Sequence, residues 1–147
     1  MTTVSTLDWR AIRVGDEVTP LEVPVTATVI VAGAIASRDY MPVHHDPAFA
    51  KRQGSPNIFM NILSTNGLCV RFLTDWAGPE AMVRKLAIRL GTPSFPDDPL
   101  AFSGSVTDVA DGAAGEGLVS VSFSAKTSIG EHVSGTAVIS LLDERAT

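Results

Sequence analysis

The residues best suited to chemistry lie in one polar stretch, residues 38–46, which contains Asp39 and, five residues later, His44. A carboxylate and an imidazole can bind one water molecule between them, and histidine changes its protonation near neutral pH. Burial could also raise the pKa of Asp39. Pro42 stiffens the loop between the two residues, so both side chains can point into one cleft. The stretch is therefore a candidate acid–base site.

A structural interpretation of the same stretch is also open. Asp39 could pair only with Arg38, and His44 or His45 could only stabilise the start of the next helix. Asp46 is expected to cap that helix. A metal site built from His44, His45 and Asp46 is less favoured, because adjacent histidines point in different directions. We therefore expect no bound metal.

The remaining reactive residues fit structural roles better than catalytic ones. Cys69 lies in an apolar helical pattern and is expected in the core. The glycines at positions 112, 115 and 117 belong to a hairpin turn and not to a phosphate-binding loop. His132 precedes Val133 in an alternating strand pattern and is expected to face solvent.

The elements that must position the polar stretch are two predicted helices. A short helix begins after Asp46 and stops at Gly54. A longer helix is expected from Ser55 and Pro56 to about Trp76, and its apolar residues cover nearly its whole circumference, which is typical of a buried helix. Residues 25–37 could be a strand or a short helix.

The second half of the chain changes to an alternating pattern. Alternation predicts strands at residues 85–90, 119–126 and 133–141, and more weakly at 101–109. Residues 8–24 look extended, and the short glycine-containing turns fit antiparallel neighbours. An antiparallel sheet wrapped around one long central helix is the hotdog fold, of the α+β class, here as a single domain over residues 1–147. Its uncovered edges predict dimerisation.

Composition limits the classes of function. The chain has 147 residues, a net charge of −5 and one cysteine. No apolar run approaches the ~20 residues of a membrane span, and no basic cluster suits a nucleic-acid backbone. The N-terminus shows no secretory signal, and a lone cysteine forms no internal disulfide. We expect a cytoplasmic protein without a membrane or nucleic-acid partner.

Three segments resemble the MaoC-like enoyl-CoA hydratases. Residues 39–44 carry that family's Asp, Pro and His at the family's spacing, and residues 46–50 and 89–93 match it as well. The resemblance implies hydration of a 2-enoyl-CoA, with Asp39 and His44 as the acid–base pair. It also implies that backbone amides at Asn61 and Ile62 bind the thioester oxygen. No cofactor is implied, because coenzyme A is part of the substrate.

The chain departs from the general family at three places. The family usually has Gly before the Asp and Asn two residues after it, where this chain has Arg38 and Met41. The family's His-Gly at the start of the central helix corresponds to Met60 and Asn61. The shape of the pocket must therefore differ from that of straight-chain hydratases.

A narrower resemblance is to the small subunits of actinobacterial hydratases that degrade the cholesterol side chain. Residues 43–46, 57–63 and 74–79 carry it. It implies a steroid or similarly bulky enoyl-CoA and a heteromer with a second MaoC-like chain that carries an OB-type domain. A homodimer remains the other possibility for the partner.

Two rival functions remain open from sequence. Hotdog domains also serve as acyl-CoA thioesterases, which use a carboxylate near the central helix to activate water; the presence of His44 favours hydration. The chain could also be a non-catalytic, acyl-CoA-binding subunit of a hetero-oligomeric hydratase, against which the presence of both Asp39 and His44 argues. The sequence leaves open which of the two is acid and which is base.

Overall fold

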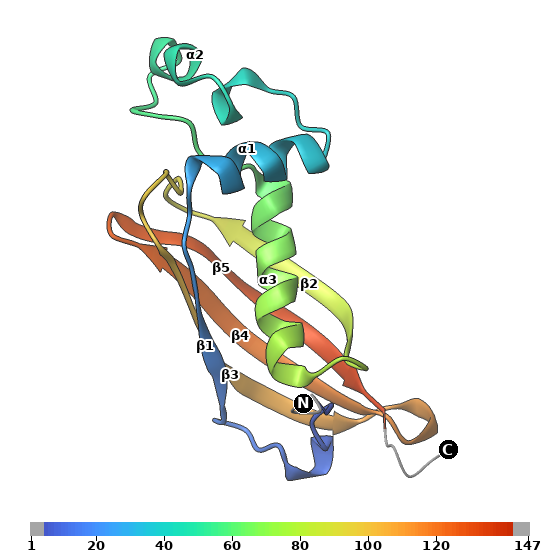
Figure 1. Cartoon of the computed structure of the whole chain (residues 1–147). Coiled ribbons are helices and arrows are strands. Elements are labelled where there is room, and N and C mark those ends of the chain that lie inside the picture. The colour runs from blue at the N-terminus through green and yellow to red at the C-terminus, as the bar shows by residue number, and fades with distance from the viewer. Residues whose placement is uncertain (1–4, 143–147) are drawn as a thin grey trace.

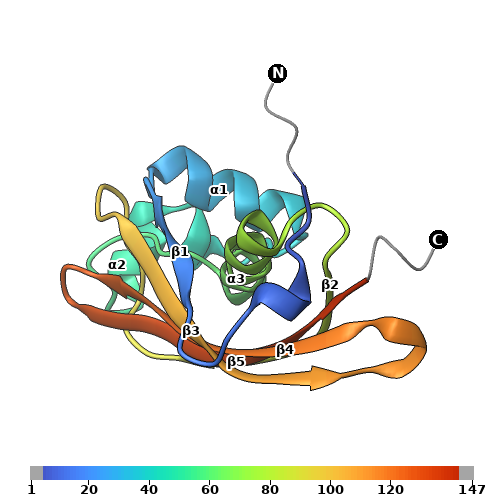
Figure 2. The same ribbon diagram turned by 90° about the horizontal axis from the view of Figure 1, so that it is seen from below.

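Five antiparallel strands form one curved sheet in the order β1-β3-β4-β5-β2. The computed structural model describes residues 5–142. A long helix, α3, lies along the concave face of the sheet, and the sheet curves around it (Figures 1 and 2). The predicted α+β hotdog arrangement is confirmed. The strands are β1 (Glu17–Val23), β2 (Met82–Leu90), β3 (Leu100–Asp111), β4 (Gly117–Thr127) and β5 (Gly130–Leu141).

Three helices stand at one end of the sheet or on its concave face: α1 (Ala27–Ala36), α2 (Pro47–Arg52) and α3 (Ile62–Ala77). The segment that sequence left undecided is α1, whose first turn is capped by the hydroxyl of Thr26. Helix α1 crosses the N-terminal end of α3 (Figure 1). Gly33 permits this crossing, because a side chain there would collide with the hydroxyl of Ser64. The crossing brings the end of α1 close to the start of α3.

Helix α3 packs on the sheet through one face. Cys69, Phe72 and Leu73 are buried, and the ring of Phe72 stacks on Phe102 with centroids 5.4 Å apart. The predicted core position of Cys69 is confirmed, and burial raises the pKa of its thiol to about 12, so the thiol stays protonated.

Another side of α3 is not covered in the single chain. Ile62 and Leu63 are 48% and 49% exposed, and Val70 is also exposed. The expectation of a helix buried all round is therefore wrong for this side. Exposed apolar residues of this kind are typical of a surface that packs against a partner.

The start of α3 also differs from the prediction. The helix begins at Ile62 and not near Ser55, because the side chain of Asn61 accepts a hydrogen bond from the Ser64 amide and caps the first turn. Residues 55–60 run as irregular chain, and the Met60 amide donates to the carbonyl of Ser94. The Ser-Pro pair had the composition of a helix start, but the hydroxyl of Ser55 donates to the carbonyl of Asn57 at 2.7 Å and caps no helix.

The solvent-facing position expected for His132 is wrong. Ala125 of β4 pairs with Val133, and the next residue, Lys126, pairs with Glu131. His132 is thus the extra residue of a β-bulge, which breaks the alternation and turns its side chain inward. The side chain is buried, with 3% exposure of the residue.

Within residues 5–142, no helix combines the length and apolar character that crossing a membrane requires.

The glycines at positions 112, 115 and 117 do lie at the β3–β4 turn, as predicted, and Gly115 takes the left-handed backbone conformation with φ 82°.

Candidate active site

Asp39 is held by the way that α1 ends. The amide of Arg38 donates to the carbonyl of Ile35, and the amide of Asp39 donates to that of Ala34. These two bonds form a Schellman motif with Arg38 in the left-handed conformation, φ 58°. Glycine suits this position best, and a non-glycine residue there costs about 1 kcal/mol. The rigid helix end thus fixes the backbone of Asp39.

His44 lies at the end of a short 3₁₀ turn, Pro42–His44, and its orientation is fixed on two sides. Its Nδ1 lies 2.7 Å from the carbonyl oxygen of Phe59. Its ring also contacts the Phe59 ring edge-on, with centroids 5.0 Å apart. Because a carbonyl can only accept, Nδ1 carries a hydrogen, and in the neutral imidazole Nε2 presents a lone pair.

The structure brings the two predicted residues together. Nε2 of His44 lies 3.3 Å from Oδ2 of Asp39. The His44 side chain is 9% exposed and that of Asp39 is 26% exposed, so the pair opens toward solvent from the Asp39 side. A neutral Nε2 and a carboxylate are both acceptors and repel each other unless hydrogen lies between them. A water molecule that donates one hydrogen to each of them satisfies both.

Asp39 has two further hydrogen-bond donors. Nδ2 of Asn61 donates to its Oδ2 at 3.0 Å, and the amide of Met41 donates to its Oδ1 at 3.3 Å. The Asn61 bond does most to lower the pKa of Asp39 below its ordinary value; burial opposes this, and the Met41 amide and the charge of His44 add to it. Burial acts on this pKa in the expected, upward direction, but the hydrogen-bond donors outweigh it, so the net shift is downward and not upward. Asp39 is a carboxylate at neutral pH.

Asn61 connects Asp39 to the start of α3. Its side-chain oxygen caps the helix while its nitrogen donates to Asp39 and, at 2.9 Å, to the hydroxyl of Ser37. The backbone amides of Asn61 and Ile62 make no hydrogen bond with any other residue in the described part of the chain. Free amides at a helix N-terminus attract negative charge. The Asn61 side chain contacts Asp39 directly, and the two predicted amide donors belong to the same helix start.

Replacing Asn61 with aspartate tests its effect on Asp39. The Asn61→Asp variant keeps a good N-cap but puts a second carboxylate where a donor stood, so the pKa of Asp39 is expected to rise. We expect the pH dependence of activity to shift toward higher pH, while the thermal midpoint changes by a few degrees at most. An unshifted pH–rate profile would contradict this. The comparison variant is Asn61→Ala, which loses the helix cap and is expected to lose about 1 kcal/mol of stability.

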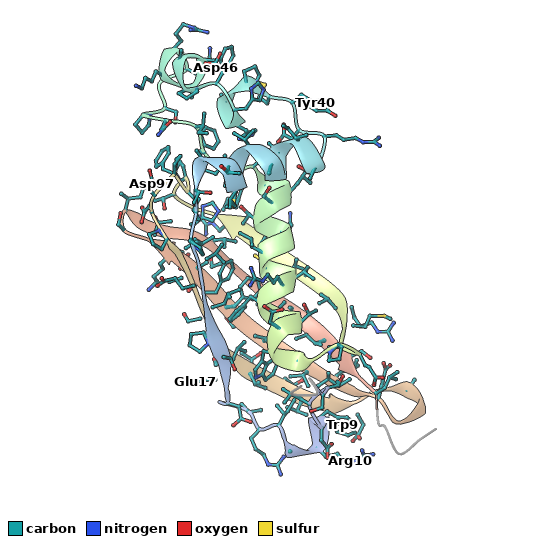
Figure 3. The ribbon with its side chains drawn as sticks, in the orientation of Figure 1. Trp9, Arg10, Glu17, Tyr40, Asp46 and Asp97 are labelled. Atoms are coloured by element: carbon teal, nitrogen blue, oxygen red, sulfur yellow. The ribbon has the colours of Figure 1, made fainter. Side chains whose placement is uncertain are left out.

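The other polar residues of the 38–46 stretch have structural roles. Asp46 accepts a hydrogen bond from the Phe49 amide at 3.0 Å and caps α2, as predicted. His45 is exposed, and its ring lies 3.2 Å from the carbonyl oxygen of Tyr40. Figure 3 shows Tyr40 beyond the end of α1 and Asp46 at the start of α2. No group of three metal-ligating side chains occurs between residues 5 and 142.

Sequence reasoning missed a buried network behind this pair. Nδ1 of His132 lies 2.7 Å from the carbonyl oxygen of Thr92, and its Nε2 lies 2.9 Å from the hydroxyl of Thr65. Thr65 is in the first turn of α3, and its amide donates to the carbonyl of Asn61. The one sequence signal was a histidine next to a buried valine in a strand, which does not distinguish a bulge from regular pairing.

His132 makes the stability of the fold depend on pH. Burial, which penalises the charged imidazolium, lowers the pKa of His132, and its bond to Thr92 only partly opposes this. The unfolded chain therefore binds a proton below about pH 6.5, while the native chain does so only at lower pH. The free energy of unfolding is expected to fall as the pH drops below that value, with a slope of at most ~1.4 kcal/mol per pH unit, until the pH passes the lowered native pKa. Urea denaturation between pH 7.5 and 5 measures this, and an equal slope in His132→Asn would contradict it.

Comparisons with known proteins identify the family of the chain. Residues 11–129 match the family model described as the MaoC like domain. The chain is 44% identical over 116 residues to the 3-oxo-4,17-pregnadiene-20-carboxyl-CoA hydratase beta subunit of Mycobacterium tuberculosis, over 79% of this chain and 86% of that one. A chain in the crystal structure of the ChsH1-ChsH2 complex from the same organism has a TM-score of 0.82 and 41% identity, over 88% of this chain and 98% of that one.

The same fold occurs in a protein with lower sequence identity. The (R)-hydratase from A. caviae involved in PHA biosynthesis has a TM-score of 0.79 at 22% identity, over 91% of this chain and 99% of that one, which shows the fold alone. The family match covers most of the chain, and it includes Asp39, His44 and Asn61. This chain belongs to the MaoC-like family.

Proposed function

We propose that this chain is the catalytic subunit of an enoyl-CoA hydratase, which adds water across the C2=C3 bond of a 2-enoyl thioester. One observation carries the proposal: Nε2 of His44 lies 3.3 Å from Oδ2 of Asp39 while Nδ1 bonds to Phe59. This leaves two acceptors that converge on one position, where a single water can bind.

The first step is attack by this water. It donates one hydrogen to Nε2 of His44 and the other to Asp39, which directs its oxygen lone pair at C3 of the substrate. As the C3–O bond forms, the C2=C3 electron pair moves toward the thioester oxygen, and the proton passes to His44. Asp39, whose pKa is lowered, stays ionised and stabilises the imidazolium. His44 is thus the base of this step.

The second step returns the proton to C2. The enolate oxygen that forms in the first step accepts hydrogen bonds from the free amides of Asn61 and Ile62, where the N-terminal end of the α3 dipole also favours negative charge. Collapse of the enolate restores the thioester carbonyl and takes the proton from His44 to C2. Water is consumed and no other reactant is needed. Because one group moves the proton, both additions occur on one face of the double bond.

The substrate is proposed to be bulky and steroid-like. The relative with 44% identity is named as a hydratase of a pregnadiene-carboxyl-CoA. Tyr40 and Met41, which directly follow Asp39, are 66% and 51% exposed. These apolar side chains suit a large hydrophobic acyl group better than a short one.

The partner is proposed to be a second MaoC-like chain, with an OB-type domain as the sequence resemblance implies. The relative is named a beta subunit, and the solved structure is a complex of two proteins. Strand β2 forms an edge of the sheet. A second hotdog chain could pair with this edge and cover Ile62, Leu63 and Val70 of α3.

The test is an assay of the purified chain, alone and co-expressed with the second MaoC-like chain. Substrates are crotonyl-CoA and 3-oxo-4,17-pregnadiene-20-carboxyl-CoA, with loss of enoyl absorbance and gain of one water mass as readouts. We expect the complex to hydrate the steroid thioester in preference to crotonyl-CoA. Release of free coenzyme A from a saturated acyl-CoA, without hydration, would instead identify a thioesterase. An active homodimer would contradict only the proposal of a second, different chain as partner, and not the proposed hydratase activity.

A further inference from the structure

The β-bulge of β5 turns a buried histidine toward the first turn of α3, which lies next to Asp39. His132 is the residue without a partner on β4, and both it and Val133 are buried, whereas regular pairing would bury only one of them. Bulges often re-aim a side chain beside an active site. The bulge therefore allows the side chain of His132 to be buried next to that of Val133, which regular strand pairing would not allow.

The contacts of His132 define its tautomer. Since the carbonyl of Thr92 can only accept, Nδ1 carries a hydrogen, and in the neutral imidazole Nε2 accepts from the hydroxyl of Thr65. The neutral ring is thus fully hydrogen-bonded. It joins the chain just after β2, the bulge in β5 and the first turn of α3 through two bonds of 2.7 and 2.9 Å.

Thr65 connects His132 to Asn61, which in turn contacts Asp39. Its amide makes the first hydrogen bond of α3, to the carbonyl of Asn61, at 3.1 Å. Asn61 then donates to Asp39 at 3.0 Å. The preceding residue, Met60, is tied to Ser94. The start of α3 is therefore tied to β5 through His132 and to the β2–β3 loop through Met60.

We propose that His132 is a positioning residue, which acts through Thr65 to hold the first turn of α3 in register with Asp39. This inference rests on the proposed hydratase function. The first turn carries the Asn61 side chain that orients Asp39 and the amides that face the thioester oxygen. Displacements of about 1 Å in such groups can cost about 100-fold in rate. A buried histidine that only stabilises the fold would leave the rate of the folded protein unchanged.

Two substitutions break the same contact from opposite sides. Thr65→Val removes the hydroxyl and keeps the shape, and His132→Asn keeps a donor near the Thr92 carbonyl but loses the acceptor for Thr65. Each is expected to lower kcat by about 10- to 100-fold with KM within about twofold. The double variant is expected to fall no further, because both changes remove one interaction. His132→Gln, whose amide oxygen can accept from Thr65, is expected to recover most of kcat.

The control is Thr74→Val, at the other end of α3, where the hydroxyl bonds only to carbonyls of its own helix. It is expected to leave kcat unchanged. All rates are measured on the assembled protein, at a temperature well below the unfolding transition of each variant. The folded fraction is measured by circular dichroism, and each rate is divided by the concentration of folded protein. Wild-type kcat in Thr65→Val and His132→Asn, or losses that multiply in the double variant, would overturn the inference. If the unchanged protein hydrates no enoyl-CoA, the proposed function itself fails, which is a separate result.

Discussion

Replacing Asp39 with asparagine is expected to lower kcat for hydration by about 1,000-fold. The variant keeps the size of the side chain but loses the negative charge that orients the water and stabilises the imidazolium of His44. General acid–base groups typically contribute 10²- to 10⁴-fold. The measurement is the rate of enoyl absorbance loss at saturating substrate, with the thermal midpoint recorded for each protein.

The control for this change is Asp75→Asn. Asp75 lies near the end of α3 and is exposed, and in the described part of the chain it pairs with Arg71, four residues earlier, at 3.2 Å. Surface pairs of this type contribute little to stability, so wild-type kcat and nearly unchanged stability are expected. A folded, assembled Asp39→Asn protein with normal kcat would remove Asp39 from the mechanism.

Replacing His44 with asparagine is expected to cost a similar factor, about 10²- to 10⁴-fold in kcat. The amide of the new side chain can still donate toward the carbonyl of Phe59, so the loop keeps its anchor, but the Nε2 acceptor that faces Asp39 is lost. KM is expected to change little, because the lost interaction is with the water and not with the bound thioester.

His45 provides a matched control one residue away. The residue is exposed, and within residues 5–142 the hydrogen bond of its ring is to the carbonyl of Tyr40. His45→Asn is therefore expected to hydrate at the wild-type rate. Equal losses in the two variants would mean that the loop as a whole matters, and not the imidazole that meets Asp39.

Much of the architecture could be predicted because its signals are local. In β4, the alternation of Val119, Val121 and Phe123 with serines predicts one buried face, and all three are buried. The cap at Asp46 and the buried Cys69 are likewise set by neighbouring residues. The meeting of Asp39 with His44 followed from a short loop that Pro42 stiffens.

The errors arose where distant segments decide the outcome. The bulge at His132 depends on its register with β4, which no local pattern records. The pKa of Asp39 depends on a donor from Asn61, 22 residues away. The irregular chain before α3 is bonded to a distant segment, since the Met60 amide donates to the carbonyl of Ser94. The exposed side of α3 could not be distinguished from core in the sequence, because a surface that packs against a partner is as rich in apolar residues as a protein core.

One departure from the family is explained by backbone geometry. The family's usual glycine before the catalytic aspartate suits the left-handed position that ends α1, and this chain places Arg38 there at φ 58°. The helix end keeps its two closing hydrogen bonds despite the substitution. The backbone of Asp39 is thus held by the helix end although its neighbour Arg38 is not glycine.

The double variant Asp39→Asn, His44→Asn measures most directly whether both groups act on one water molecule. If they do, either single change already removes the bound water, and kcat of the folded double variant is expected to lie within about threefold of the slower single variant. Losses that multiply, so that the double variant is slower by the product of the two factors, would show that Asp39 and His44 act independently and would contradict the shared water.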